Sequence, residues 1–215
     1  MSDILAVFTL VNLKFIGMGL WMTVSISAIS IALSLIFGTV LAVLRMYNKG
    51  ILGKLSVCYI EIFRNTPSLL WILAIRFLVP LPAYSGAILA FTLFTTAMMA
   101  EIIRGGLNSI DKGQFEGAAS QGFTLLQTLM YIVLPQCFRN VVPALLSQVI
   151  TVVKDSSYLW AVAIEELTGR ANILMSRYSE TSQIFALFAA VAATYFIVNF
   201  ILSVIVRKQQ IKLNN

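Results

Sequence analysis

Charged and polar residues inside otherwise apolar segments are the part of this sequence best suited to chemistry. Lys154, Asp155, Ser156 and Ser157 follow one another directly within such a segment. An isolated charge at the centre of a bilayer costs roughly 2.5–3.5 kcal/mol on insertion scales, so these side chains are expected to face protein or a cavity. A lysine can bind an anionic group and an aspartate a cationic one. The four residues therefore predict either a polar constriction in a transport path or a structural Lys–Asp network between helices.

Two further acid–base pairs interrupt apolar segments. Glu61 and Arg64 stand three residues apart, and so do Glu101 and Arg104. This spacing places both members of a pair on one face of a helix, where they can form an ion pair. Each pair either belongs to a transport path or neutralises its own charge near the membrane boundary, and Arg104 is also compatible with an interfacial anchor.

Uncharged polar residues add further candidates. In Asn65-Thr66-Pro67, the proline removes a helical hydrogen bond and leaves carbonyl groups that need protein or water partners. A kinked helix beside a transport path and a kink required only for packing both fit this segment. Thr23 either lines a path or returns its hydrogen bond to the helix backbone. The candidate path residues are then Thr23, Asn65, Thr66, Glu101, Lys154, Asp155 and Ser156.

Several kinds of chemistry lack their usual residues in this sequence. It contains no histidine, which is the commonest metal ligand and the usual proton shuttle. Cys58 and Cys137 lie far apart, outside any Cys-x-x-Cys motif, and are interpreted as small buried hydrophobic residues. The one Gly-Lys pair, Gly53-Lys54, is followed by leucine, so it does not form a phosphate-binding loop. We expect no catalytic residue, no metal site and no cofactor on this chain.

The elements that carry these residues are expected to be membrane-spanning helices. Hydrophobic residues make up 59% of the chain and charged residues 11%, with a mean hydropathy of +0.90, whereas a soluble domain carries roughly 25% charged residues. A spanning helix needs about 20 mostly apolar residues, and the first such run is interpreted as a retained span rather than a signal peptide. The predicted fold is one all-α membrane domain over residues 1–215, with five spans at about 15–44, 55–79, 83–103, 141–164 and 181–206.

Basic residues gather on one side of this arrangement. One side receives Arg45, Lys49, Lys54, Arg104, Lys112, Arg139, Arg207, Lys208 and Lys212. The other side receives Lys14, Arg170 and Arg177, with Arg76 near its boundary. Because cytoplasmic loops carry the excess of lysine and arginine, the N-terminus is predicted outside, and the C-terminus and the loop of about 104–140 in the cytosol. This anchoring explains the net charge of +6 without a nucleic-acid partner.

The segment from Arg104 to Pro135 is too polar and too rich in glycine to cross a bilayer. Its apolar positions recur at roughly helical spacing, which predicts short helices broken by glycine. Gly122 is expected to permit a sharp turn, and Pro135 and Pro143 are expected to bend or break the helix that re-enters the bilayer. Considered alone, the segment also fits an interfacial amphipathic loop. Five spans without an internal repeat are few for a complete transporter, so an oligomer is expected.

One spacing in this segment is distinctive. From Glu116 to Pro135 it reads E-G-A-x3-G-x9-I-x-L-P. It resembles the EAA motif, E-A-A-x3-G-x9-I-x-L-P, of permease subunits in bacterial binding-protein-dependent ABC importers, and Gly117 is its single departure. The resemblance extends along most of residues 19–169. Within the family, the chain is similar to the polar amino-acid branch, most of all to glutamine- or glutamate-type permeases. The blocks that carry it are GLWMTVSIS (19–27), YIEIFRNTPSLLW (59–71), AEIIRGGLNSIDKGQ (100–114), LPQCFRNVVPALLSQ (134–148) and VVKDSSYLWAVAIEELTG (152–169).

The resemblance implies a type I ABC importer permease fold in a bacterial cell membrane, with the motif on a coupling helix seated in a groove of an ATPase subunit. The implied coupling residues are Gln114, Phe115, Glu116, Gly117, Ala118 and Gly122. The implied partners are a pair of ATP-binding subunits that hydrolyse ATP, a second permease of the same or another sequence, an extracytoplasmic solute-binding protein and a polar amino acid. A zwitterionic cargo would use Lys154 for its carboxylate and Asp155 for its amine, although Ser156 stands where the family pattern K-D-T-S has threonine.

Other interpretations remain open at this point. The outer loop from Glu165 to Glu180 either faces the solute-binding protein or is an ordinary solvated loop. The whole chain is alternatively a small ion-coupled carrier or channel subunit gated by its intramembrane charges, or an assembly subunit without a transport path. The carrier or channel interpretation leaves the EAA spacing unexplained.

Overall fold

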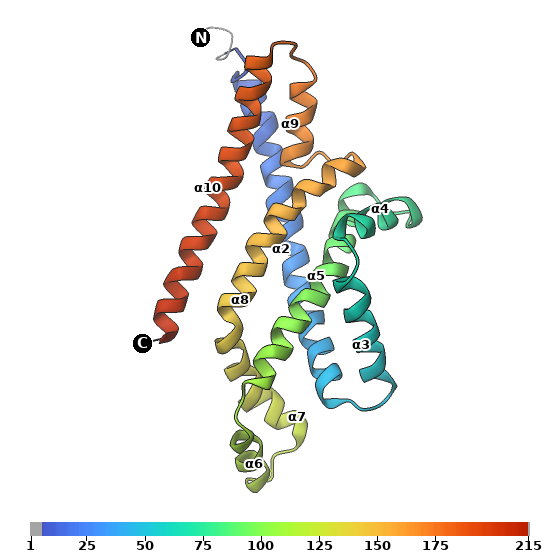
Figure 1. Cartoon of the computed structure of the whole chain (residues 1–215), viewed down its shortest axis with the longest axis vertical. Coiled ribbons are helices and arrows are strands. Elements are labelled where there is room, and N and C mark those ends of the chain that lie inside the picture. Colours follow the sequence, from blue (N-terminus) through green and yellow to red (C-terminus); the bar gives the residue numbers. More distant parts are fainter. Residues whose placement is uncertain (1–5, 215) are drawn as a thin grey trace.

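Helices make up nearly all of the described chain. The computed structural model describes residues 6–214, with side chains for residues 6–208, and this range contains no β-strand. The helices are α2 (Leu10–Tyr47), α3 (Ile51–Arg64), α4 (Ser68–Leu78), α5 (Ala83–Asn108), α6 (Lys112–Ser120), α7 (Leu125–Thr128), the π-turn η1 (Leu129–Val133), α8 (Leu134–Asp155), the 3-10 helix η2 (Ser156–Val162), α9 (Leu167–Met175) and α10 (Thr181–Asn214). Figure 1 shows a long bundle with α9 at one end and α6 at the other, and we call these the α9 end and the α6 end.

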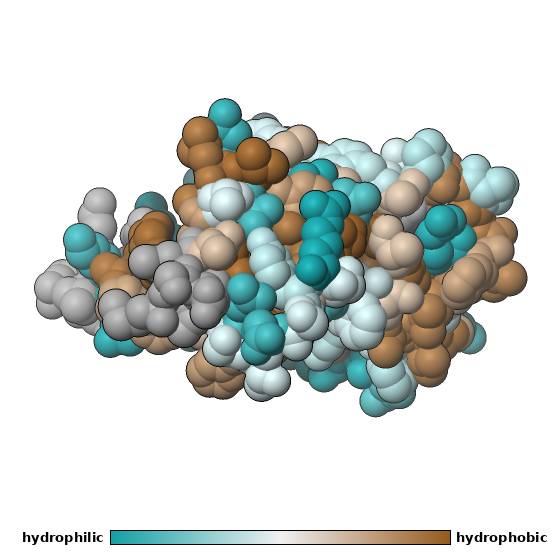
Figure 2. Space-filling model, turned by 90° about the horizontal axis from the view of Figure 1, so that it is seen from above, coloured by the Kyte–Doolittle hydropathy of each residue, from teal (hydrophilic) through white to brown (hydrophobic). Residues whose placement is uncertain are grey.

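Within the described residues, four helical segments are long and apolar enough to cross a membrane. They are Leu10–Tyr47, Ala83–Asn108, Leu125–Val162 and Thr181–Lys208. Large hydrophobic side chains along them are exposed, as Trp21 (71%) and Phe185 (72%) illustrate. Seen from the α9 end, hydrophilic residues occupy much of the middle of the face, and hydrophobic residues lie mostly toward its edges (Figure 2). Apolar flanks around a polar end are what a bundle solvated by lipid requires.

The predicted span at about 55–79 consists of two helices, α3 and α4, neither of which reaches 18 residues. They are separated at Asn65-Thr66-Pro67, and Figure 1 shows α4 turned across the bundle rather than along α3. Pro67 has no N–H to continue the helix. The Asn65 side chain donates to the Glu61 carbonyl (2.8 Å) and the Thr66 hydroxyl donates to the Ile62 carbonyl (2.8 Å), so both side chains satisfy carbonyl groups at the end of α3.

The centre of the bundle is the pair α2–α5, whose backbones approach closely through small residues. The Ser30 and Ser34 hydroxyls donate to the Ile88 and Thr92 carbonyls of α5 at 3.2 and 3.1 Å. A Cβ added at Gly38 would lie 2.9 Å from the Met99 Cβ, which is too close for an undisturbed contact. Small residues at such positions are the usual basis of helix association in lipid, where apolar surface alone gives no driving force.

The helix that re-enters the bundle after the polar segment is continuous through both of its prolines. Because Pro135 cannot donate to the carbonyl four residues earlier, the helix widens there into the π-turn η1, in which the Leu134 N–H bonds to the Leu129 carbonyl. Pro143 lies inside α8 without ending it. Of the two effects expected, a bend or a break, the break is wrong for both prolines, and the distortion is confined to the π-turn beside Pro135.

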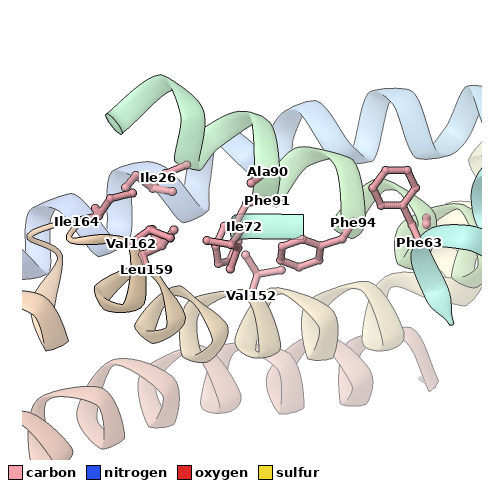
Figure 3. Close-up of a cluster of buried hydrophobic side chains, with 12 residues drawn as sticks. Ile26, Phe63, Ile72, Ala90, Phe91, Phe94, Val152, Leu159, Val162 and Ile164 are labelled. Atoms are coloured by element: carbon pink, nitrogen blue, oxygen red, sulfur yellow. The ribbon is translucent and has the colours of Figure 1, made fainter. Parts of the chain in front are cut away.

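An apolar core joins α2, α3, α4, α5, α8 and η2 (Figure 3). Phe91 and Phe94 of α5 point toward Val152 of α8, and Ile72 of α4 fills the space beside them. All four side chains are at most 4% exposed. This core fixes the position of the end of α8, which carries Lys154 and Asp155.

Candidate functional site

The polar segment predicted to be a docking element forms a short helix, α6, with defined ends. Asp111 caps its N-terminus by accepting from the Gly113 N–H (2.6 Å). Beyond its C-terminus Gly122 has a φ of +79°, the left-handed conformation that glycine adopts without steric strain, and the expected sharp turn is confirmed. Thr124 and Gln127 then form a reciprocal capping box that starts α7.

One face of α6 is held against the bundle, and the other is open to solvent. Ala118 is buried, and the Phe115 ring lies 6.1 Å from the Tyr47 ring of α2. Gln114 accepts a hydrogen bond from the Gln136 side chain of α8 (3.0 Å). Glu116 and Gly117 are exposed. Five of the six predicted coupling residues therefore lie in α6, and the sixth, Gly122, lies in the turn that follows it. The helix touches both α2 and α8 and keeps a free outer surface.

We expect Gly117→Ala to stabilise α6 slightly without changing its position. A Cβ at Gly117 would meet no atom within 4 Å, and alanine in a helix interior is more favourable than glycine by roughly 0.5–1 kcal/mol. Hydrogen exchange of the α6 amides should slow accordingly. Gly122→Ala is the matched control, because the same side chain at φ +79° is strained and should accelerate exchange. Faster exchange in Gly117→Ala would contradict this account.

An ion-pair cluster connects α2, α3 and α5 above α6. The Glu101 carboxylate forms ion pairs with Arg45 (3.1 Å), Arg64 (3.3 Å) and Arg104, which also donates through its Nε at 2.6 Å. Arg45 pairs in addition with Glu61 (2.9 Å). The cluster contains three arginines and two glutamates, so it keeps one net positive charge.

The two predicted pairs within single helices have different outcomes. The Glu101–Arg104 pair is confirmed. The expected Glu61–Arg64 pair is wrong, since Glu61 binds Arg45 of α2 and Arg64 binds Glu101 of α5. Tertiary packing explains this difference, because α2 and α5 pack against α3 and bring Arg45 and Glu101 closer to Glu61 and Arg64 than these two residues are to each other. Among the predicted path residues, Asn65 joins the edge of this cluster by donating to Glu61 (3.2 Å).

The polar residues at the end of α8 lie in different surroundings. Lys154 is exposed in a groove of about 490 Å³ between α8 and α10, which Tyr195 and Asn199 also line. Asp155 is half-buried, and in the described part of the chain no salt bridge joins it to Lys154. Ser156 is fully buried and donates to the Val153 carbonyl (2.8 Å). No described contact links these residues to the ion-pair cluster around Glu101.

Thr23 belongs to a buried network centred on Glu166, which sequence reasoning placed in a solvated or partner-facing loop. Glu166 is 0% exposed and caps α9 by accepting from the Thr168 (2.9 Å) and Gly169 (2.8 Å) N–H groups. Its carboxylate also accepts from the hydroxyls of Thr23 of α2 (3.2 Å) and Tyr195 of α10 (3.0 Å).

The Glu166 carboxyl therefore ties three helices together at the α9 end. Burial raises its pKa above the ordinary value, and the hydrogen bonds that it accepts act in the opposite direction. The expected exposure of Glu166 is wrong. The signal for this role was weak, because glutamate is not among the residues that typically cap helix N-termini.

Comparisons with known proteins extend over nearly the whole chain. A family model described as "Binding-protein-dependent transport system inner membrane component" matches residues 30–213. The chain is 38% identical to the probable glutamine ABC transporter permease protein GlnP of Bacillus subtilis, over 98% of this chain and 99% of that protein. It is 30% identical to the glutamate/aspartate import permease protein GltK of Escherichia coli O157:H7, over 91% and 92% of the two chains.

Two solved structures are similar in fold. One is an amino acid ABC transporter crystallised with histidines, with a TM-score of 0.79 and 29% identity over 90% of this chain and 92% of that one. The other is an inward-facing form of the MetNI methionine ABC transporter, with a TM-score of 0.76 over 94% of this chain and 99% of that one. At 18% identity this second similarity concerns the fold alone.

Proposed function

The chain belongs to the family of binding-protein-dependent transport system inner membrane components, and from that premise we propose that α6 couples it mechanically to an ATPase subunit. The observation that carries the proposal is the position of the EAA spacing. It lies on a short capped helix that contacts α2 and α8 on one side and exposes Glu116 and Gly117 on the other. Movement imposed on the exposed face would therefore reach the spanning helices directly.

The chain is a transmembrane permease subunit of an amino-acid ABC importer. It is not an enzyme, because ATP is hydrolysed by a separate ATPase subunit. A second permease subunit acts with it. For the cargo we propose glutamine or glutamate, delivered by an extracytoplasmic solute-binding protein. The support is that relatives over nearly the full length carry the names of glutamine and glutamate/aspartate permeases.

We further propose that the α6 end faces the cytosol of a bacterial cell, with the N-terminus outside. Basic residues at the α6 end support this orientation, including Arg45, Lys49, Lys54 and Lys112. The α3–α4 pair then completes a fifth, broken crossing. Irregular backbone inside a membrane needs partners for its polar groups, and at this break the Asn65 and Thr66 side chains bond the Glu61 and Ile62 carbonyls.

For the translocation path we propose Lys154 and Asp155 at the end of α8, with Glu101, Asn65 and Thr66 nearer the α6 end. The groove beside Lys154 also contains the Asn199 amide, whose Oδ1 is buried without a hydrogen-bond partner in the described part of the chain. An amino group and an amide oxygen in one groove suit a small polar cargo. Thr23 and Ser156 are buried outside this groove, with Thr23 bonded to Glu166 and Ser156 to the Val153 carbonyl.

Asp155→Ala is expected to reduce uptake about 10- to 100-fold while the subunit still assembles, because hydrogen bonds to charged groups contribute roughly 1.5–3 kcal/mol. Uptake of labelled glutamine and recovery of the complex by size-exclusion chromatography measure the two effects. Ser147→Ala is the matched control, since Ser147 lies on the same helix, is exposed and donates its hydroxyl to the Pro143 carbonyl of that helix. Failed assembly in Asp155→Ala would assign Asp155 to a structural network instead.

Reconstitution in proteoliposomes tests the function as a whole. With the ATPase and binding protein present, glutamine or glutamate uptake should require ATP and stop when either partner is omitted. A panel of labelled amino acids would identify the cargo. Uptake driven by an ion gradient without the ATPase would contradict the proposal and favour a small ion-coupled carrier.

A further inference from the structure

A deep apolar groove on the side of the bundle has no part in coupling or in the proposed path. It lies between α2, α3 and α5, has a volume of about 720 Å³ and opens to the exterior. Its walls are almost entirely hydrocarbon, from residues such as Leu41, Leu55, Ile62 and Leu93. In a bilayer, a groove of this kind faces lipid unless protein covers it.

The groove has the length of one bilayer leaflet. Along α3 its lining runs from Leu52 to Phe63, a rise of about 16 Å at 1.5 Å per residue. Half of a typical hydrocarbon core is about 15 Å thick. The groove starts beside the α2–α3 turn, which Figure 1 shows at the α6 end of the bundle. It can therefore hold an acyl chain from the level of the head groups to the middle of the membrane.

Positive charge lies at the α2–α3 turn, close in sequence to Leu44 and Leu52, which line the end of the groove. Lys49 lies in the α2–α3 turn and Lys54 in the first turn of α3. Both are exposed and form no salt bridge in the part of the chain that is described. The sequence from Met46 to Ile60 contains no acidic residue. Glu61 and Glu101 lie near this end but are paired with arginines. The N-terminal end of α3 adds its partial positive charge at the same place.

We propose that this groove binds an anionic phospholipid, with one acyl chain between α2, α3 and α5 and its phosphate head group at Lys49 and Lys54. The apolar length accounts for the chain, and the unpaired lysines account for the selectivity for negative charge. The site is independent of the coupling helix and of the proposed translocation path. It would retain one lipid beside the ion-pair cluster that joins α2, α3 and α5.

The chain offers a natural probe for this site. Cys58 lines the groove and is exposed, so its expected burial is wrong, whereas Cys137 is 0% exposed as expected. A thiol-reactive fluorophore should therefore label Cys58 and not Cys137. The labelled full-length chain, assembled with its ATPase, is placed in nanodiscs containing brominated phosphatidylglycerol or brominated phosphatidylcholine. Bromine quenches the fluorophore on contact. We expect phosphatidylglycerol to quench several-fold more strongly than phosphatidylcholine at equal mole fraction.

Lysine variants identify the source of this selectivity. The double variant Lys49→Ala/Lys54→Ala should remove the excess quenching by phosphatidylglycerol. Lys208→Ala is the matched control, because it removes an exposed positive charge from α10, outside the groove, and should leave the excess intact. Native mass spectrometry of the unlabelled complex should show the same pattern in retained phosphatidylglycerol, without a fluorophore in the groove.

Two outcomes would overturn the proposal. Equal quenching by both lipids, with no lipid retained in the mass spectrum, would mean that the groove holds ordinary exchanging lipid. Absence of quenching by either lipid, with none retained, would mean that protein covers the groove, most simply the second permease subunit. Selectivity that persists in the double lysine variant would equally exclude the assigned head-group site.

Discussion

Replacing Glu116 by lysine is expected to abolish ATP-driven uptake while the subunit stays folded in the membrane. Glu116 is exposed on α6 and forms no ion pair in the described part of the chain, so the fold does not depend on its charge. Exposed substitutions usually change stability by about 0.5 kcal/mol or less. Reversal of a charge within a docked interface costs several kcal/mol through repulsion and lost partners, which corresponds to a loss of at least about 100-fold in ATPase affinity.

The experiment separates docking from folding. Co-purification of the ATPase, its rate of ATP hydrolysis and amino-acid uptake are measured on the same preparations. Glu180→Lys is the charge-matched control, because Glu180 is exposed at the opposite end of the bundle and should leave ATPase binding unchanged. Normal ATPase binding and uptake in Glu116→Lys would exclude Glu116 from the coupling interface.

Glu166→Ala is expected to be the most destabilising single substitution in the α9 end of the bundle. It removes the acceptor for two backbone N–H groups and for the hydroxyls of Thr23 and Tyr195. Each buried group left without a partner costs about 1–3 kcal/mol, so a total loss of about 3 kcal/mol or more is expected. At roughly 2–4 °C per kcal/mol for a chain of this size, Tm should fall by about 6–12 °C.

A neighbouring residue provides the control for this prediction. Glu165 is half-exposed, and its carboxylate pairs with Arg170 at 3.3 Å. An exposed ion pair contributes about 1 kcal/mol or less, so Glu165→Ala should change Tm by a few degrees at most. Thermal unfolding of both variants in the same detergent gives the comparison, and Glu166→Gln should fall between them because it keeps an acceptor. Equal Tm values for Glu165→Ala and Glu166→Ala would contradict the clamp described for Glu166.

Features that depend on local chemistry could be predicted from the sequence. Runs without charged residues located the long helices, because a charge is costly to bury in lipid and is therefore scarce in membrane-spanning segments. Helix α10, for example, begins at Thr181 as expected. The turn at Gly122 followed from the conformational freedom of glycine. A kink at Pro67 followed from the missing N–H, but the full separation of α3 from α4 did not, and nothing local determines the direction in which α4 turns.

Features that depend on packing could not be predicted in this way. The partner of Glu61 is Arg45 on another helix, and spacing along α3 alone favoured Arg64. Glu166 lies next to Glu165 in the sequence, yet one carboxylate is 0% exposed and the other reaches solvent. The two residues have the same intrinsic preferences, so only the arrangement of α2, α9 and α10 distinguishes them.

The unbroken helical segment from Leu125 to Val162 has a mechanical consequence. Between the π-turn and Lys154 it forms one rod about 35 Å long, at 1.5 Å per residue. A tilt of about 5° at the π-turn would therefore displace Lys154 by about 3 Å, roughly the length of a hydrogen bond. The segment acts as a lever arm whose short end meets α6. A small rotation where this segment meets α6 is thus enough to move the exposed Lys154 by about the length of a hydrogen bond.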